Sequence, residues 1–194
     1  MLGRSDIPAT SSGVKLTYDD FAQFPDDRKR HELIDGKHYV TPSPNVRHQR
    51  IAGTLFGLIW SYLQVNPIGE VFMAPFDVVF SDFDVVEPDL LFISKDRIPQ
   101  IVTPLHVRGT PDLVVEVTSK GTRKRDETVK RRLYECAGVL EYWFVDTQAD
   151  AVCVYQRSGE RLARVAELSR RANETLTTAM LPGLELPLAR IFRD

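Results

Sequence analysis

The chain has 194 residues, a formal charge of −2 and two cysteines. Hydrophobic residues make up 43% and charged residues 27% of the sequence, a composition typical of a globular domain with a core of its own. The slightly acidic balance argues against a surface that is basic all over, so a contact with nucleic acid has to come from a local patch. Two cysteines exclude a disulfide framework and a zinc site of four cysteine ligands.

The sequence predicts one domain behind a short tail, with no membrane span. No apolar run approaches the roughly 18 residues that a span needs, and the first residues lack the apolar core of a signal peptide. We therefore expect a cytoplasmic protein. Residues 1–14 are rich in Ser, Thr, Gly and Pro, which favours a flexible tail. No linker-like composition divides residues 15–194, which we interpret as a single domain.

Three helices are predicted before the closing segment of the chain. Thr17 can cap a short first helix. A long helix is expected over residues 43–64, with Ser43 as its N-cap, because apolar residues recur there at helical spacing. A third helix is expected over residues 123–137, with Gly138 placed to end it.

Strand-like runs alternate with these helices along the first part of the chain and follow one another at its end. The turn pair Asp35-Gly36 predicts a hairpin. Pro75 marks a break or bulge in the run that follows the long helix. The predicted strand segments are 31–40, 69–80, 85–94, 111–117, 141–146, 151–156 and 161–168, and residues 181–192 look like a turn and a short helix. This order favours a mixed α/β or α+β sheet with helices on its faces.

Acidic residues on these strands point to metal-dependent phosphodiester chemistry. Mg²⁺ takes one or two carboxylates and keeps water and phosphate as its other ligands. Asp112 and Glu116 lie on one strand, but four residues of strand span roughly 13 Å, too far for one ion. Asp89 shares a strand face with apolar residues, where an acid needs a partner or a metal. We therefore expect Asp89 to join Glu116, with Glu32 as a third candidate.

A lysine near these acids could hold the phosphate or orient a water molecule. At 100° per residue, Asp126 and Lys130 fall on the apolar face of the helix predicted at 123–137, on one stripe with Val129, Leu133 and Ala137. They either neutralise each other as an i,i+4 pair or Lys130 reaches into the site. Lys120 is the rival, because it has the strand parity of Glu116 if that strand extends so far.

The stretch over residues 120–132 is the most basic in the chain, with seven basic and two acidic residues. Arg123, Lys124 and Arg125 are the candidates for contacts with a nucleic-acid backbone. The alternative is a solvated helix face. The large aromatic residues Trp60, Trp143 and Tyr134 sit in apolar patterns, so we expect them in the core rather than stacked on bases.

Taken in order, four segments resemble the Uma-type putative restriction endonuclease family, within the PD-(D/E)xK nuclease superfamily. They are "HELIDG", "EPDLLFIS", "PDLVVEVTS" and "RDETVKRRLYECAGVLEYWFVD". The resemblance runs over nearly the whole chain, from about residue 16 to about 192. It implies a restriction-endonuclease-like fold, a mixed four- or five-stranded sheet flanked by helices, here extended by extra antiparallel strands.

The resemblance also implies a site for Mg²⁺ (or Mn²⁺) and hydrolysis of DNA. Glu32 matches the acid of the "ELIDG" motif, Asp89 that of "PD" and Glu116 that of the "(D/E)xK" strand. Asp89 and Glu116 would hold the metal. The sequence departs from the parent pattern two residues after Glu116, where Thr118 stands in place of lysine. The family places its lysine on the next helix, where Lys130 matches it.

Two functions are carried forward from these observations. The first is a metal-dependent endodeoxyribonuclease, with a homodimer as the family-level expectation for cutting both strands. The second is a catalytically silent fold that serves as a nucleic-acid or protein interaction module, which Thr118 and the acidic balance motivate. His48, Asp126 and Lys120 are the accessory candidates. His48 matches a histidine of the family's long helix. The alternative is that His48 has only a structural role.

Overall fold

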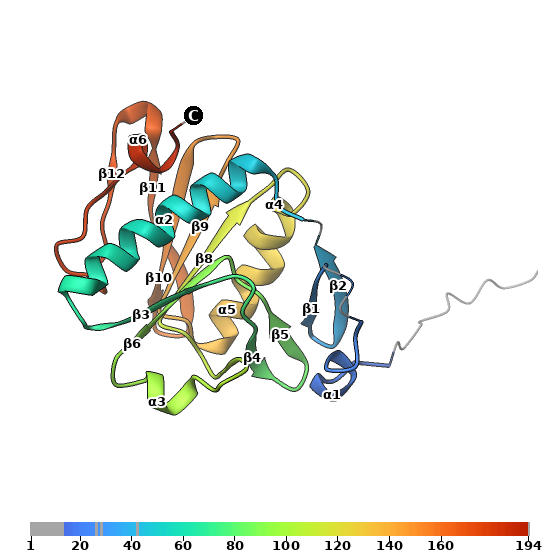
Figure 1. The fold of residues 1–194 in the computed structure, drawn as a ribbon. Coiled ribbons are helices and arrows are strands. Elements are labelled where there is room, and N and C mark those ends of the chain that lie inside the picture. Colours follow the sequence, from blue (N-terminus) through green and yellow to red (C-terminus); the bar gives the residue numbers. More distant parts are fainter. Residues whose placement is uncertain (1–13, 26, 28, 42, 194) are drawn as a thin grey trace, which may run out of the picture.

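The computed structural model describes residues 14–25, 27, 29–41 and 43–193, and a six-stranded mixed sheet lies at its centre (Figure 1). Apart from Val14, the predicted tail lies outside these residues. The strands run in the order β11 (Arg161–Ser169), β10 (Ala151–Ser158), β9 (Glu141–Asp146), β8 (Leu113–Thr118), β6 (Leu90–Ser94) and β3 (Gly69–Met73). Strands β8 and β9 are parallel and the other neighbours antiparallel. All residues of β8 are buried, as a central strand requires.

A second, five-stranded sheet lies beside the first one. Its strands run in the order β2 (Lys37–Thr41), β1 (Arg30–Ile34), β5 (Asp84–Val86), β4 (Val78–Ser81) and β7 (Val107–Arg108). The predicted hairpin is confirmed as β1–β2, with Asp35 at φ 52° and Gly36 at φ 68°, the left-handed pair that a tight hairpin turn needs. The predicted strand at 85–94 is two strands, because Glu87, Pro88 and Asp89 separate β5 from β6, and these two strands belong to different sheets.

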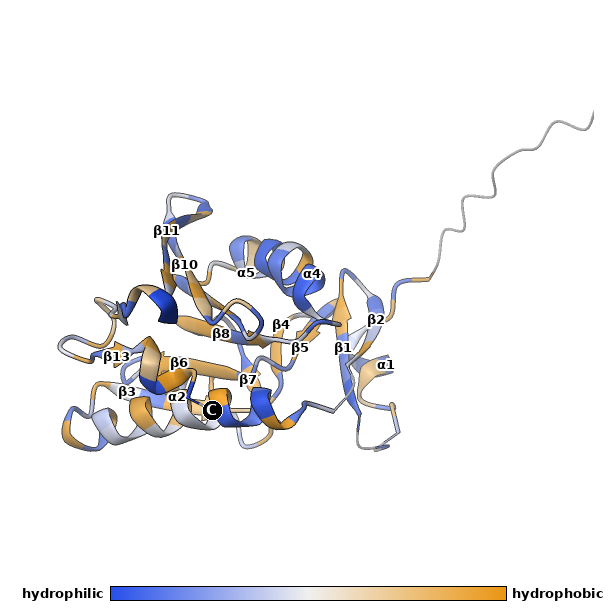
Figure 2. Cartoon of the chain, turned by 90° about the horizontal axis from the view of Figure 1, so that it is seen from above, coloured by the Kyte–Doolittle hydropathy of each residue, from blue (hydrophilic) through white to orange (hydrophobic). Residues whose placement is uncertain are grey.

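Helices cover both faces of the six-stranded sheet. Helix α2 (Val46–Val65) packs on one face and buries Ile51 and Leu55 against Leu113 and Val115 of β8. The other face carries one continuous helical segment, made of α4 (Arg123–Arg125), η1 (Asp126–Lys130) and α5 (Arg131–Ala137). Figure 2 shows α2 and α5 on opposite sides of β8. Since side chains alternate along a strand, Glu116 points to the face opposite Val115, toward the α4–α5 side.

Shorter elements complete the chain. They are α1 (Tyr18–Phe21), α3 (Ile98–Ile101), η2 (Arg170–Ala172), β12 (Thr175–Leu176), β13 (Leu186–Pro187) and α6 (Leu188–Ile191). Thr17 caps α1 as predicted, through a capping box with Asp20. Near the end of the chain, α6 brings Leu188 and Ile191 into the core beside α2. No helix among the described residues is long and apolar enough to cross a membrane.

The structure corrects two predictions about α2. Its N-cap is Asn45, whose side chain accepts from the His48 amide, and the predicted cap Ser43 lies outside the helix. Trp60 is 49% exposed rather than in the core. The buried face of α2 includes Ile59 and Leu63, so Trp60 stands about 100° away from Ile59 around the helix axis.

The helix predicted at 123–137 is present, and Gly138 ends it in the left-handed conformation, at φ 90°. Its middle, Asp126–Lys130, is a π-helical turn in which the Arg131 amide donates to the Asp126 carbonyl, five residues back. The wider turn changes which residues face the sheet. Lys130 and Tyr134 are buried, whereas Val129, on the predicted apolar stripe, is 37% exposed.

Candidate active site

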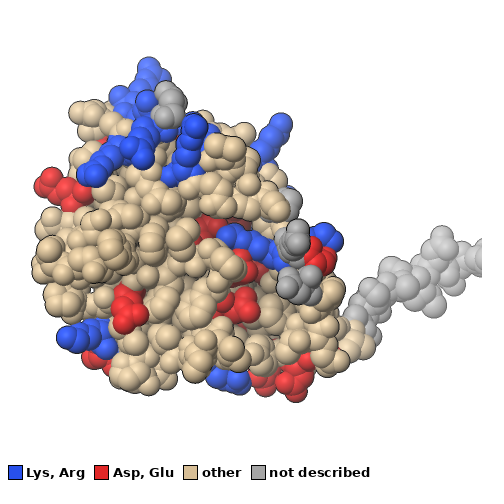
Figure 3. All heavy atoms as spheres, viewed as in Figure 1, with Lys and Arg blue, Asp and Glu red and all other residues tan. Residues whose placement is uncertain are grey.

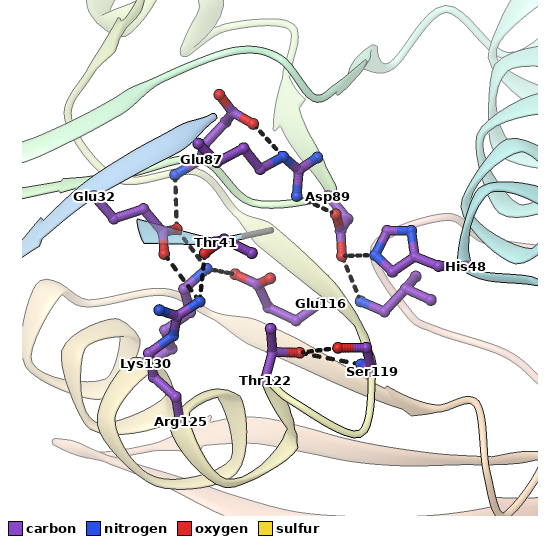
Figure 4. Close-up of polar contacts among 12 residues, drawn as sticks. Glu32, Thr41, His48, Glu87, Asp89, Glu116, Ser119, Thr122, Arg125 and Lys130 are labelled. Atoms are coloured by element: carbon purple, nitrogen blue, oxygen red, sulfur yellow. Dashed lines mark hydrogen bonds and ion pairs between the residues drawn. The ribbon is translucent and has the colours of Figure 1, made fainter. Parts of the chain in front are cut away.

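A cavity of about 310 Å³ opens where the two sheets meet. Its walls come from β1 of the small sheet, the start of β6 and the end of β8 in the large sheet, the first residues of α2, and the α4–η1 helix. Figure 4 shows the acidic and basic side chains of these elements pointing toward one another. The cavity brings together all four predicted catalytic residues, which are Glu32, Asp89, Glu116 and Lys130.

Asp89 is buried just before β6 and is held by three donors from three elements. Arg30 of β1 donates to its Oδ1 at 2.7 Å, while the His48 ring (Nε2, 3.0 Å) and the Val117 amide (2.8 Å) contact Oδ2. Burial alone would raise the pKa of Asp89, but His48 and Arg30 lower it below its usual value. Asp89 is therefore ionised and fixed in position beside the end of β8.

Glu116 is as deeply buried as Asp89, but its surroundings shift its pKa in the opposite direction. Its Oε1 accepts two hydrogen bonds, one from Lys130 Nζ at 2.8 Å and one from the Tyr134 hydroxyl. Burial raises the pKa of Glu116, Lys130 lowers it, and the surrounding carboxylates raise it again, so the pKa lies well above its usual value. The site thus holds one carboxylate that favours ionisation and one that favours a proton.

Lys130 reaches the cavity from the π-helical turn and lies between two acids. Its Nζ is 2.6 Å from Glu32 Oε1 and 2.8 Å from Glu116 Oε1. Burial alone would lower the pKa of Lys130, but the charges of Glu116, Glu32 and Asp126 raise it above its usual value. Lys130 is therefore a fixed cation. Within the described residues no ion pair links it to Asp126, the partner that the i,i+4 spacing offered.

The hairpin strand β1 supplies a second layer of charge around the cavity. Glu32 accepts from the Glu87 amide at 3.2 Å, and Arg125 Nη2 lies 3.5 Å from its other oxygen. Arg30 bridges Asp89 and Glu87, with its Nε 2.5 Å from Glu87. Burial raises the pKa of Glu87 to about 7, although Arg30 lowers it in part. These contacts join the small sheet to the large one through charged groups.

The charged side chains that line the cavity are equal in number. Four carboxylates and four cationic side chains line it: Glu32, Asp89, Glu116 and Asp126 against Arg30, Lys120, Arg125 and Lys130. Within the described residues no three His, Cys, Asp or Glu side chains are grouped as a metal site. Mg²⁺ needs only one or two carboxylates, so the oxygen donors of Asp89 and Glu116 fit a hard divalent cation.

The structure places the other predicted residues in different surroundings. Lys120 lines the cavity but lies beyond the end of β8, which stops at Thr118, and it is exposed. Arg123 is bonded to Asp146 on β9, and Arg125 to Thr41 as well as Glu32, so only Lys124 of the predicted backbone-binding trio is exposed. The structure therefore favours a supporting role for Arg123 and Arg125.

Asp112, which is too far from Glu116 along the strand to share an ion with it, lies at the far end of β8. Its carboxylate accepts from the Ser94 amide and hydroxyl and pairs with Arg97. Asp112 therefore stabilises the fold there and has no contact with the cavity.

Sequence reasoning missed Arg30 and Glu87, and it assigned Tyr134 to the core alone. Arg30 lies two residues before Glu32, and Glu87 lies two residues before Asp89. Because side chains two positions apart on a strand share a face, this spacing was the signal in the sequence that could have identified them. Tyr134 is fully buried, as expected, but its hydroxyl also donates to Glu116. It follows Lys130 by four residues, one turn along the helix.

The raised pKa of Glu87 predicts an unusual dependence of stability on pH. Between the usual value near 4.5 and about 7, folded Glu87 keeps a proton that the unfolded chain has released. The free energy of unfolding should therefore fall as pH rises through this window, by about 2 kcal/mol for a partly buried group. Urea unfolding at pH 5 and pH 8 measures it. A Glu87→Gln variant should lose this part of the slope, and an unchanged slope would contradict the assignment.

The comparisons agree with this fold and with the predicted family. No curated protein matches the chain. A solved structure, described as a putative nuclease belonging to DUF820 from Anabaena variabilis, superposes with a TM-score of 0.76 at 20% identity, over 91% of this chain and 97% of that one. This likeness confirms the predicted restriction-endonuclease-like fold. The model of the family Uma2, described as "putative restriction endonuclease", matches residues 18–189. The chain therefore belongs to the Uma2 family.

Proposed function

We propose that the chain is a metal-dependent endonuclease that hydrolyses phosphodiester bonds of DNA, with Asp89 and Glu116 as the ligands of Mg²⁺ or Mn²⁺. The observation that carries the proposal is the meeting of these two carboxylates with protonated Lys130 in one cavity. Family and fold support a restriction-endonuclease-like nuclease. The oxygen donors of the two carboxylates add support for a hard divalent ion.

The residues of the chain would divide the work according to their surroundings. When bound, Mg²⁺ supplies a water molecule of lowered pKa and neutralises charge on the phosphate. Asp89, held by three donors, keeps its carboxylate in fixed geometry. Glu116 would hold the ion as a carboxylate, since a nearby positive charge lowers a carboxyl pKa.

Lys130 contributes a permanent positive charge rather than proton transfer. A lysine whose pKa is raised holds its proton and cannot act as a general base at neutral pH. Its ammonium group orients Glu116 and Glu32, and its charge stabilises the negative charge that develops on the phosphate. His48 is a positioning residue, because its ring contacts Asp89 and helps to hold that carboxylate in place.

A supercoiled-plasmid nicking assay tests the proposal. The full chain should nick plasmid with Mg²⁺ or Mn²⁺ and should be inactive in EDTA. A Glu116→Gln preparation, purified identically, should be inactive with either ion and so exclude a contaminating nuclease. Activity that survives EDTA or the Glu116→Gln change would overturn the assignment. Linear product would accompany nicked circles if two copies act together, as the proposed homodimer requires.

A silent interaction module is the second candidate, and two observations favour it. Thr118 stands where the parent pattern has its lysine, and Arg30 and Lys130 already neutralise part of the charge on Asp89 and Glu116. Ion binding separates the two functions without an activity assay. The nuclease should be stabilised by millimolar Mg²⁺ in thermal unfolding, more at pH 8 than at pH 6, because protons compete for Glu116. A silent module should show no shift at either pH.

A further inference from the structure

A cluster of arginines lies on the outer side of α2, away from the cavity. Arg50 of α2, Arg190 of α6 and Arg193 line two adjoining hollows whose floor is formed by α2 residues that include Gly53, Thr54 and Gly57. We call these six residues the arginine groove. Figure 3 shows Lys and Arg side chains gathered at the top of the molecule, around the end of the chain marked in Figure 1.

The three arginines of the groove carry charge that the fold does not use. Arg50, Arg190 and Arg193 are exposed, and their side chains form no ion pair or hydrogen bond within the described residues. Next to them, Arg47 and Arg170 both pair with Asp150. Glu185 is the one acid that lines either hollow in the described part of the chain. In a protein of net charge −2, this is a concentrated positive surface.

The floor of the groove leaves room for a close approach. A Cβ atom added at Gly53 or Gly57 would have no neighbour within 4 Å, so internal packing does not require either glycine. Each costs an α-helix up to about 1 kcal/mol relative to alanine. Two such glycines between arginines provide a shallow track along which an extended anion can lie against the helix backbone.

The track leads to the candidate active site. Asn45 and His48, in the first turn of α2, line the catalytic cavity. Gln49 follows Asn45 by one turn and lines the hollow that contains Arg50. Gly57 lies nine residues beyond His48, about 13 Å along the helix. This length corresponds to about four phosphates of one DNA strand, at 3.4 Å of axial rise each.

We propose that the arginine groove binds the phosphate backbone of the DNA substrate to one side of the bond that is cut. The inference rests on the proposed nuclease function and adds where the flanking DNA lies. It also explains a mismatch between sequence and structure: Arg123 and Arg125 of the predicted basic stretch hold Asp146 and Glu32. The free arginines come instead from α2 and the end of the chain.

Binding of a fluorescently labelled DNA duplex by the full chain, measured by anisotropy in EDTA, tests the groove without cleavage. At 0.1 M salt, each phosphate contact contributes about eightfold through counterion release. Combined Arg50→Ala, Arg190→Ala and Arg193→Ala changes should therefore weaken binding by more than about a hundredfold. The slope of log affinity against log salt should fall by about 2.7. Gly57→Glu, whose added Cβ has no neighbour within 4 Å, should weaken binding by roughly tenfold without lowering thermal stability, since glutamate is more favourable than glycine in a helix.

A matched control removes the same charge elsewhere. Lys37, Arg132 and Arg161 are exposed and lie outside both hollows, and their combined replacement by alanine should change affinity less than about threefold. Groove variants that bind as well as the wild type would overturn the inference. If the wild type still nicks plasmid in that case, the nuclease function stands and only the groove fails. If the wild type neither binds nor nicks DNA, both fail.

Discussion

A Lys130→Met variant is expected to lose roughly 10²–10³-fold in cleavage rate, and about 3 kcal/mol in free energy of unfolding at pH 7. Methionine keeps most of the volume and the unbranched shape of the lysine side chain but removes its charge. Glu32 and Glu116 would then face each other without the ammonium group that now lies 2.6 and 2.8 Å from them. Plasmid nicking and urea unfolding measure the two losses.

A double variant separates the charge effect from damage to the core. Adding Glu116→Gln to Lys130→Met removes one of the unpaired carboxylates, so the double variant should recover part of the lost stability but no activity. Lys120→Ala is the control for the rival lysine. Since Lys120 is exposed, its removal should cost less than about 0.5 kcal/mol and less than tenfold in rate. A larger loss of rate for Lys120→Ala than for Lys130→Met would reverse the assignment.

An Asp89→Ala variant is expected to lose about 3–5 kcal/mol in free energy of unfolding, the cost of leaving a buried ionic partner alone, together with all measurable cleavage. The change leaves the Arg30 guanidinium, the His48 ring and the Val117 amide without their shared acceptor. Asp89→Asn keeps the shape and should be less destabilising, yet equally inactive, because an amide is a poor ligand for Mg²⁺ compared with a carboxylate.

Asp112→Asn is the matched control for Asp89. Asp112 is also a buried aspartate with an arginine partner and a backbone amide donor, but at the opposite end of β8. Its replacement should lower the melting temperature in differential scanning calorimetry and leave the cleavage rate, measured well below that temperature, within about threefold. Equal loss of activity in the Asp112 and Asp89 variants would mean that both act through stability alone.

Much of the candidate site could be predicted because strand alternation determines which side chains share a face. The position of Asp89 beside Leu91 and Ile93, and of Glu116 beside Val114, is a property of each strand alone. The two faces meet because β6 and β8 are neighbours in the sheet. The choice of Lys130 over Lys120 rested on the family resemblance and on helical periodicity, which tolerates one irregular turn in a short segment.

Features that depend on contacts between distant segments could not be predicted. The π-helical turn at 126–130 has no signature in the spacing of apolar residues, which led to Val129 being placed on the buried face. The partners of Arg123 and Arg125 belong to β9 and the β1–β2 hairpin. The fold therefore engages these two arginines in hydrogen bonds within the protein, which the basic run in the sequence did not reveal. Conversely, Arg50 and Arg193 are 143 positions apart and meet only because the end of the chain packs near α2.

The position of the cavity between the two sheets has a mechanical consequence. Arg30 and Glu32 belong to the small sheet, whereas Asp89 and Glu116 adjoin or belong to the large one, and their ion pairs span the boundary. The groups proposed for catalysis thus also connect the two sheets of the molecule. Any displacement of the β1–β2 hairpin would therefore separate Arg30 from Asp89 and Glu32 from Lys130, so the geometry of the site depends on how the two sheets pack together.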